Sequence, residues 1–399
     1  MKTLYLFLND EYIGNLYVDE TRGKEEFSFS FTNDFLLKKD PSMIDPELFT
    51  FNGRQYASNG VFGFVNDMIP DRFGRLLIER REMDISNEMN VALKKLNTSD
   101  YLVKVNDLAR MGGLRIKESL DGDFVNNEKN AIPPYIYLRD IENASMEIDA
   151  NEPVDEDVYR KLLLPSSSLG GARPKANIYY GEKIYIAKFP SKNDSYDVEL
   201  FEYIVGDIAK KCGIDVPELM IEKYSKYGHT MLTKRFDRDG NKRIHYMSAL
   251  TALLAKDGES GNYSYIDLVD FIKSYSRNIN KNLKELYCRM VFSYLINNTD
   301  NHLRNHAFLL KDNKYELSPM FDVNPSLYET NFELPFGGVM NKDGIIEESL
   351  YFNLTITEAD SIYNRIGQTI VEQLERYKEE YRDIAKQIDR LLKITRSRL

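Results

Sequence analysis

The stretch NNTDNHLRNHAFLL, residues 297–310, concentrates ionisable and amide side chains between an apolar helical pattern and an apolar strand pattern. Asp300 and Asn305 are five residues apart, the spacing of the proton-accepting Asp and the metal-binding Asn in phosphoryl-transfer loops. In such loops a carboxylate orients an attacking hydroxyl, and a neutral amide oxygen binds Mg²⁺ without adding negative charge. His302 and Arg304 lie between the two, where they could meet phosphate charge. An exposed polar turn is the alternative, because this spacing is common by chance.

A second carboxylate follows in the segment LSPMFDVNPS. Asp322, preceded by Phe321, comes 17 residues after Asn305 and beyond a predicted hairpin around Asp312-Asn313. Phosphoryl-transfer enzymes of the kinase type place a second Mg²⁺-binding aspartate in this position. The alternative is a structural cap, because Asp before Asn-Pro-Ser also favours a turn.

Two further segments upstream could bind the phosphates of a nucleotide. Lys188 in IYIAKFP is predicted to lie on a strand, with Ile184, Ile186 and Phe189 on the opposite face. A cation in that position could contact ATP phosphates. The alternative is a solvent-facing strand lysine, which is the more common case for an isolated Lys.

The second of these segments is the small-residue loop SLGGARPK, residues 168–175, directly before a predicted strand. Glycine allows backbone N–H groups to approach anionic oxygens closely, which is how phosphates are bound. A Gly-Gly pair is also typical of a plain turn, so the loop alone indicates little. Together, the four segments occur in the order that an ATP-dependent phosphotransferase requires.

The elements that must position these segments are predicted from periodicity. The first part is strand-rich, with a hairpin around Asn9-Asp10 and alternating Phe27, Phe29 and Phe31. We expect a strand-rich N-terminal subdomain, a linker and lead-in segment, a small ATP-binding lobe and a helical C-lobe with the catalytic loop. Their predicted ranges are residues 1–125, 126–164, 165–237 and 238–399.

Helical spacing dominates the later part of the chain. The segment VELFEYIVGDIAKK has an apolar face of Leu200, Ile204 and Ile208, and LKELYCRMVFSYLI leads directly into the polar stretch at 297. The apolar stripe from about Glu358 onward is predicted to pack on the protein's own core, with a coiled-coil arm as the less favoured alternative. The predicted fold class is therefore α+β.

Composition excludes several classes of protein. The net charge of −10 argues against nucleic-acid binding over the whole surface. Two cysteines without metal-ligand spacing, no apolar signal region and no apolar run of membrane-spanning length favour a cytoplasmic protein without a membrane segment. Four histidines without HExxH, and the absence of GxSxG and GxxxxGK[ST], disfavour zinc hydrolases, serine hydrolases and P-loop NTPases.

Taken together, these motifs resemble those of the HipA-type serine/threonine kinases, the toxins of bacterial HipA/HipB toxin–antitoxin systems. SSLGGARPKA is similar to the family's glycine-loop segment, IAKFP to its ATP-lysine strand, and LTKRFDR to its strand-to-hinge motif. LINNTDNHLRNHAFLL resembles the catalytic loop and YELSPMFDV the metal-aspartate segment. FVNDMIPDRFGRLL and VNDLARMGGLRI extend the resemblance to the first half of the chain.

The resemblance implies a two-lobed protein-kinase-like fold, with ATP and Mg²⁺ as cofactors. It makes Asp300 the catalytic base, Asn305 and Asp322 the Mg²⁺ ligands, and Ser168 a site of inhibitory autophosphorylation. It also implies a set of residues around the nucleotide: Ser168, Gly170, Gly171, Ala172, Arg173, Pro174, Lys175, Lys188, Lys234, Arg235, Phe236, His302, Arg304, Asn305, Phe321 and Asp322.

The chain departs from the family pattern at two places. Lys234 replaces the usual hinge glutamate, and IHYMSALTALL lacks the acidic segment that many members have after the hinge. The resemblance implies a helix-turn-helix antitoxin of the HipB type as partner and a translation-related protein substrate such as an aminoacyl-tRNA synthetase. We expect no direct nucleic-acid binding by this chain alone. Two alternatives remain open: a non-catalytic nucleotide-binding partner in a repressor complex, and a small-molecule phosphotransferase.

Overall fold

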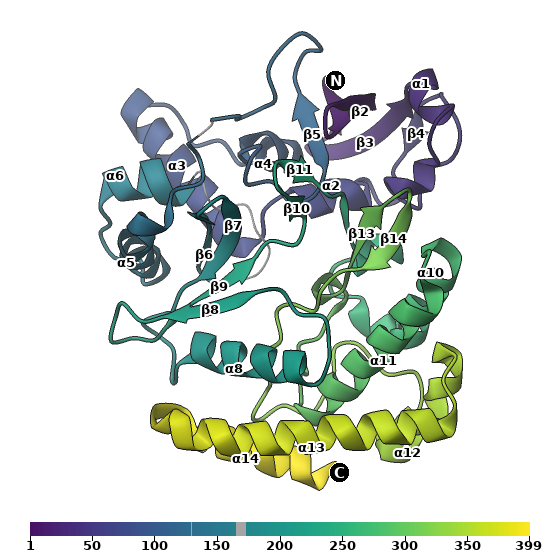
Figure 1. Ribbon diagram of the computed structural model, residues 1–399. Coiled ribbons are helices and arrows are strands. Elements are labelled where there is room, and N and C mark those ends of the chain that lie inside the picture. Colours follow the sequence, from purple (N-terminus) through teal and green to yellow (C-terminus); the bar gives the residue numbers. More distant parts are fainter. Residues whose placement is uncertain (129, 165–172) are drawn as a thin grey trace. The chain divides into compact units, whose positions relative to one another are not determined.

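The computed structural model describes residues 1–128, 130–164 and 173–399, and the chain forms two compact units (Figure 1). The first unit comprises Met1–Asp194 and Glu222–Met247. The second comprises Ser195–Ile221 and Ser248–Leu399. Strands β8 (Leu219–Glu222) and β12 (Tyr246–Ser248) lie where the chain passes from one unit to the other.

The first unit begins with an antiparallel sheet in the order β4-β3-β2-β1-β5. Its strands are β1 (Lys2–Leu8), β2 (Glu11–Thr21), β3 (Lys24–Phe31), β4 (Gln55–Tyr56) and β5 (Leu114–Lys117). The turn between β1 and β2 places Asn9 at φ 55°, a left-handed conformation that Asn tolerates better than most residues. Phe27, Phe29 and Phe31 are buried against the core, which confirms both the predicted hairpin and the predicted strand.

Helices of different lengths make up much of the rest of the first unit. They are α1 (Asn33–Leu36), η1 (Pro41–Met43), α2 (Gly63–Met68), α3 (Arg72–Met89), α4 (Thr98–Lys104), η2 (Tyr135–Tyr137), α5 (Leu138–Asp149), α6 (Glu156–Val158) and η3 (Tyr159–Leu163). Leu77 of α3 is buried, and its carbonyl accepts a 2.7 Å hydrogen bond from the hydroxyl of Tyr159. This hydrogen bond connects η3 to α3, although the two elements are far apart in the sequence.

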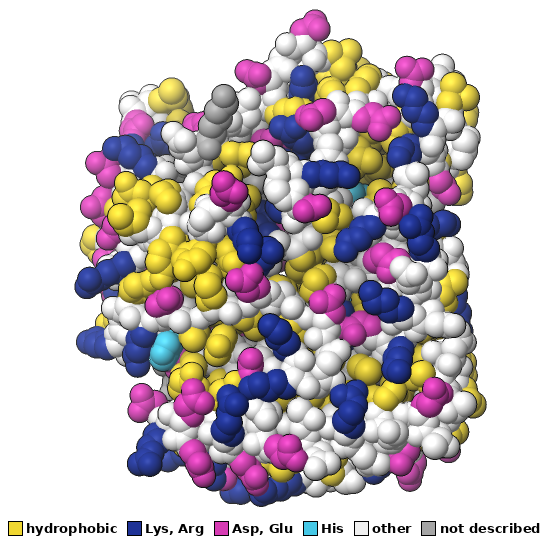
Figure 2. All heavy atoms as spheres, viewed as in Figure 1, with side chains coloured by type: hydrophobic (Ala, Val, Ile, Leu, Met, Phe, Trp, Pro, Cys, Tyr) yellow, Lys and Arg dark blue, Asp and Glu magenta, His cyan; other side chains and the backbone are white. Residues whose placement is uncertain are grey.

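A second sheet of the first unit pairs β6 (Lys175–Tyr180), β7 (Lys183–Lys188) and β9 (Thr230–Lys234), with β7 in the middle and both pairings antiparallel. The turn between β6 and β7 contains Gly181, which takes φ 60°. Figure 2 shows hydrophobic side chains gathered on the left at mid-height, where Figure 1 places this sheet. The exposed ring of Tyr180 at the end of β6 packs edge-on against Tyr135, with centroids 4.9 Å apart.

A buried charge network connects this sheet to the loop before β5. Arg235 follows β9 and is 2% exposed, and its guanidinium bonds to Asp237, to the carbonyls of Ala109 and Arg110 and to Asn177. Asp237 also accepts the Gly112 N–H at 2.7 Å. Next to it lie the two short strands β10 (Arg238–Asp239) and β11 (Lys242–Arg243).

The second unit is mainly helical. Its elements are α8 (Val198–Lys211), α9 (Ala249–Ala252), η4 (Ser260–Asn262), α10 (Tyr265–Tyr275), α11 (Ile279–Leu295), η5 (Leu303–Asn305), β13 (Ala307–Lys311), β14 (Lys314–Leu317), α12 (Lys342–Glu348), η6 (Ser349–Phe352), α13 (Ile356–Glu380), η7 (Arg382–Ile384) and α14 (Ala385–Ser397). The β13–β14 hairpin turns at Asp312 and Asn313, both at positive φ, as predicted.

Helix α11 forms the centre of this unit, because most of its residues from Leu283 to Leu295 are buried. The apolar stripe of α13 packs against it, and α14 folds back along α13 (Figure 1). The prediction that the C-terminal stripe packs on the protein's own core is therefore confirmed. Among the described residues, no helix is both long enough and apolar enough to span a membrane.

The buried network around Asp237 generates a first prediction. Burial alone would raise the pKa of Asp237, but Arg235, Arg238 and the Gly112 N–H outweigh this effect and hold the pKa well below its usual value. Asp237→Asn leaves Arg235 buried without its counter-ion, and we expect a loss of about 3–5 kcal/mol in the free energy of unfolding. Urea denaturation followed by circular dichroism measures it.

The exposed neighbour Asp239 on β10 is the matched control, and Asp239→Asn should change stability by less than about 0.5 kcal/mol. Because the folded pKa of Asp237 is depressed, its contribution is present above the unfolded pKa of about 4 and is lost as pH falls below it. The difference between wild type and Asp237→Asn should therefore shrink on acidification. Equal stability of the two proteins at pH 7 would contradict a structural role for the ion pair.

Candidate active site

The polar stretch after α11 is held in place by one buried amide. Asn297 adopts φ 57° and is 2% exposed. Its Nδ2 donates to the carbonyls of Ser326 at 2.7 Å and Glu329 at 2.8 Å, and its Oδ1 accepts from Arg398 at 2.6 Å. The backbone adds a bond from the Ser326 N–H to the Asn297 carbonyl. Asn297 thus fixes the start of the catalytic-loop candidate against the segment that follows Asp322.

Asp300 and Asn305 are joined within a single turn. The carbonyl of Asp300 accepts the His302 N–H and the Nδ2 of Asn305, both at 3.0 Å. The Asp300 side chain is exposed, whereas Asn305 is 8% exposed. Because the bond to Asp300 uses the amide nitrogen of Asn305, its Oδ1 stays available as a ligand for a cation. The predicted pair is therefore brought together by the structure.

Asp322 lies close enough to Asp300 to affect its titration. Burial raises the pKa of Asp300, His302 lowers it, and the carboxylates of Asp322, Glu333 and Glu329 raise it further. Asp322 itself has φ 55°, and Asn324 Nδ2 donates to its Oδ1 at 3.3 Å. The site therefore gathers several carboxylates around Asp300.

This charge distribution is suited to a cation, although the described residues contain no group of three or more His, Cys, Asp or Glu that could hold a metal ion by themselves. Mg²⁺ is commonly bound by one or two protein oxygens, with substrate phosphates and water completing its octahedral shell. Asn305 Oδ1 and the Asp322 carboxylate are oxygen ligands of this type. The residues present therefore fit a metal that arrives together with a nucleotide.

The two polar residues inside the turn have different surroundings. Arg304 forms a two-bond ion pair with the exposed carboxylate of Asp257, at 2.6 and 2.7 Å. The Asp257 carboxylate therefore partly neutralises the charge of Arg304. The contact between Arg304 and phosphate stays a prediction. His302 is half-buried, and its charge acts on Asp300.

The turn rests on residues that the sequence motifs did not reveal. Asn301 Nδ2 donates to the hydroxyl of the buried Tyr265 at 2.6 Å, and the Leu303 N–H donates to Ser260 at 3.1 Å. The ring of His306 meets Tyr265 edge-on at 5.5 Å. Burial lowers the pKa of His306 to about 3, so this imidazole stays neutral. These supporting residues come from segments without a recognisable spacing to Asp300.

Lys188 lies at the end of β7 in the first unit and is 8% exposed, so the solvent-facing alternative is wrong. Strand alternation places Ile184 and Ile186 on the same face as Lys188, not on the opposite face as predicted. The cross-strand partner of Lys188 is Lys175, also buried, and residues directly opposite in an antiparallel pair share a face. Lys175 and Lys188 are therefore neighbours on one buried face of this sheet.

The described part of the glycine-loop segment begins at Arg173; Ser168, Gly170, Gly171 and Ala172 lie outside the described residues. Arg173 pairs with both carboxylate oxygens of Asp194, at 2.9 and 2.6 Å. Pro174 is buried, and its carbonyl accepts the Phe189 N–H at 3.0 Å.

Three residues were predicted to form the hinge facing adenine. Lys234 is partly exposed at the end of β9, and Phe236 stacks on Tyr246 with centroids 6.5 Å apart. The guanidinium of Arg235 belongs to the buried network around Asp237, and its N–H donates to the Ile184 carbonyl at 2.9 Å. Any nucleotide contact of Arg235 must therefore come from its carbonyl.

The sequence matches one protein family and two putative kinases. Residues 167–392, more than half of the chain, match the family described as the HipA-like C-terminal domain. A putative kinase of Haemophilus influenzae is 29% identical over 162 residues, 37% of this chain and 47% of that protein. The putative kinase Y4dM of Sinorhizobium fredii is 28% identical over 177 residues, 41% of this chain and 39% of that protein. The chain thus matches less than half the length of these curated relatives.

A solved structure gives the fold. The Shewanella oneidensis MR-1 toxin–antitoxin system of HipA, HipB and its operator DNA contains a chain that superposes with a TM-score of 0.71 at 19% identity, covering 98% of this chain and 96% of that one. The prediction of a protein-kinase-like α+β fold, with a strand-rich N-terminal region and a helical C-terminal region, is confirmed.

A substitution at Asn297 can remove its side-chain hydrogen bonds without changing its backbone conformation. Asn297→Gly keeps the left-handed φ without strain but leaves the Ser326 and Glu329 carbonyls without their donor. We expect a loss of about 1–3 kcal/mol in the free energy of unfolding, because the buried amide and its hydrogen bonds are lost while the exposed Glu329 can bind water instead. Hydrogen exchange should also become faster at residues 322–333. Asn313→Gly, at a positive-φ turn position of the β13–β14 hairpin, is the control, and an unchanged exchange rate in Asn297→Gly would contradict the tethering role.

Proposed function

This chain belongs to the HipA-like C-terminal domain family, and we propose that it is an ATP-dependent serine/threonine protein kinase. The observation that supports this most directly is the single turn that joins Asp300 to Asn305 through the Asp300 carbonyl, with Asp322 near enough to influence the Asp300 carboxylate. The relatives named putative kinases support the same reaction class.

In this proposal Asp300 orients the hydroxyl of the acceptor and takes its proton as the γ-phosphoryl group is transferred in line. Burial and the neighbouring carboxylates raise the pKa of Asp300, which strengthens it as a base. Asn305 and Asp322 hold Mg²⁺, which neutralises charge on the phosphates when it is bound. The hydrogen bonds from Asn297 and to Tyr265 keep the loop in position before the nucleotide arrives.

The residues of the small lobe bind the nucleotide in this proposal. Lys188 contacts the phosphates, and Lys175 on the neighbouring strand adds positive charge on the same face. The loop from Gly170 to Lys175 covers the phosphates, and Lys234, Arg235 and Phe236 face the adenine. The roles of the loop residues before Arg173 depend on the family resemblance alone.

The phosphate acceptor and the protein partner are also proposed. A protein hydroxyl is the proposed acceptor, with a translation component such as an aminoacyl-tRNA synthetase as the example that the resemblance suggests. A HipB-like helix-turn-helix antitoxin is the proposed partner, because the similar solved structure is a complex of HipA with HipB and operator DNA. The proposed place of action is the cytoplasm.

Phosphate transfer from γ-labelled ATP in the presence of Mg²⁺ tests the proposal. Asp300→Asn removes the base while keeping the side-chain volume, and we expect labelling of protein substrates and of the chain itself to fall about 10²–10⁴-fold. Asp239→Asn, on the exposed short strand β10 of the first unit, should label like wild type. ATP-induced thermal stabilisation should persist in Asp300→Asn.

The alternatives predict other results in the same assay. A wild-type chain that binds ATP without transferring label, with or without cell extract, would indicate the regulatory nucleotide-binding partner. Turnover that depends on small molecules of the extract and not on its proteins would indicate a small-molecule phosphotransferase. Undiminished labelling by Asp300→Asn would contradict the role of this residue.

Ser168 is proposed as a site of inhibitory autophosphorylation. A phosphate on this serine would repel the phosphates of ATP and disfavour the nucleotide-covering position of the loop. Intact-mass spectrometry after incubation with ATP should show a mass increase of one phosphate in wild type and none in Ser168→Ala, which should also stay active for longer. An unchanged mass of wild type, together with unchanged activity of Ser168→Ala, would contradict this proposal.

A further inference from the structure

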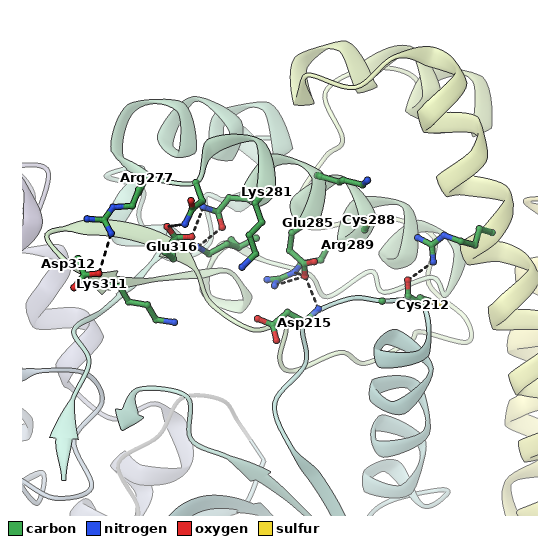
Figure 3. A pocket seen from close by; sticks show the side chains of 16 residues that line it. Cys212, Asp215, Arg277, Lys281, Glu285, Cys288, Arg289, Lys311, Asp312 and Glu316 are labelled. Carbon is green, nitrogen blue, oxygen red and sulfur yellow. Dashed lines mark hydrogen bonds and ion pairs between the residues drawn. The ribbon is translucent and has the colours of Figure 1, made fainter. Parts of the chain in front are cut away.

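A groove of about 630 Å³ opens on the second unit, away from the Asp300 turn in sequence and lined by different residues (Figure 3). It is bounded by the end of α8, the first turns of α11, the β13–β14 turn and Arg365 of α13. Arg365 donates to the Cys212 carbonyl at 2.6 Å, which fixes α13 to the end of α8. The volume falls in the range of about 300–1,000 Å³ typical of ligand pockets.

The acidic side chains on the floor of this groove already have hydrogen-bond donors. Glu285 accepts the Asp215 N–H at 3.0 Å and the Nε of the buried Arg289 at 2.8 Å. Glu316 accepts the side-chain amides of Asn278 at 2.9 Å and Asn282 at 3.0 Å. These hydrogen bonds hold the two carboxylates in fixed positions and connect the segments that form the groove (Figure 3).

The basic side chains at the rim are different. Lys281, Lys284 and Lys311 are exposed, and none forms a salt bridge with any residue in the described ranges. Arg277 meets Asp312 at 3.3 Å, but both side chains are more than half exposed, so this pair contributes little. The lining also includes the exposed carboxylate of Asp215. In total six cationic side chains and four carboxylates line the groove, which leaves an excess of positive charge.

We propose that this groove binds an acidic peptide segment of a protein partner. Its cations come from α11 and from the β13–β14 hairpin, so an extended ligand with several carboxylates can meet them together, which a single small anion cannot. The carboxylates of Glu285 and Glu316 can accept peptide N–H groups, which a phosphate backbone does not offer. The net charge of −10 also disfavours nucleic acid as the occupant. The proposal does not depend on the proposed kinase activity.

Fluorescence anisotropy with the full chain and a labelled peptide of alternating Glu and Ser tests this. We expect binding at low salt that weakens as salt screens the charges. The double variant Lys281→Glu/Lys311→Glu should bind at least about tenfold more weakly, because two attractions become repulsions. Lys273→Glu/Lys386→Glu, two exposed lysines of the second unit that do not line the groove, should bind within about twofold of wild type.

Hydrogen exchange locates the peptide independently of these variants. Added peptide should slow exchange at residues 277–285 and 311–317, and the neutral pair Lys281→Gln/Lys311→Gln covers the case in which charge reversal alters the fold. No binding at low salt, or an equal loss in the control pair, would overturn the proposal. A mixed-sequence DNA duplex that binds as tightly as the peptide and is lost in the same variants would overturn it in favour of a nucleic-acid surface.

Discussion

The candidate active site depends on the side chain of Asn297. Its amide group donates two hydrogen bonds across to the backbone of Ser326 and Glu329 and accepts one from Arg398, and Asn297 itself is only 2% exposed. These bonds hold the turn that carries Asp300 and Asn305 against the segment that follows Asp322. A hydrophobic side chain could fill the same space, but it could not satisfy these carbonyls, whose desolvation would then be uncompensated.

With the two segments fixed in this way, the electrostatics of the site follow. Carboxylates that the backbone holds close together repel one another, and this repulsion adds to burial in raising the pKa of Asp300. The arrangement is unfavourable for the isolated protein, and a bound cation would relieve the repulsion. Perturbed carboxylates of this kind are common at functional sites, because binding relieves the strain that folding imposed.

Charge has contrasting roles in the two units. In the first, Arg235 and Asp237 are buried and fully bonded, so they specify how the sheet of β6, β7 and β9 meets the loop before β5. At the groove of the second unit, the carboxylates are bonded while the lysines at the rim face solvent. The paired charges thus hold structural elements together, whereas the rim lysines without salt bridges are available to bind a ligand.

The sequence by itself determined the local elements and predicted the residues of the candidate site. Alternation at Phe27, Phe29 and Phe31, the turns at Asn9 and Asp312-Asn313, and the helical face of α8 follow from local patterns, and the structure confirms each of them. The spacing of Asp300 and Asn305 allowed the turn to be predicted because both residues lie within one short segment. Only the tertiary structure decided which distant residues support that turn. Tyr265, Ser260 and Glu333 reach it through folding of the whole unit, and no periodicity encodes such contacts. The burial of Lys188 was likewise decided by the pairing of its strand, β7, with β6 and β9. Burial of a strand residue depends on what packs on each side of the sheet.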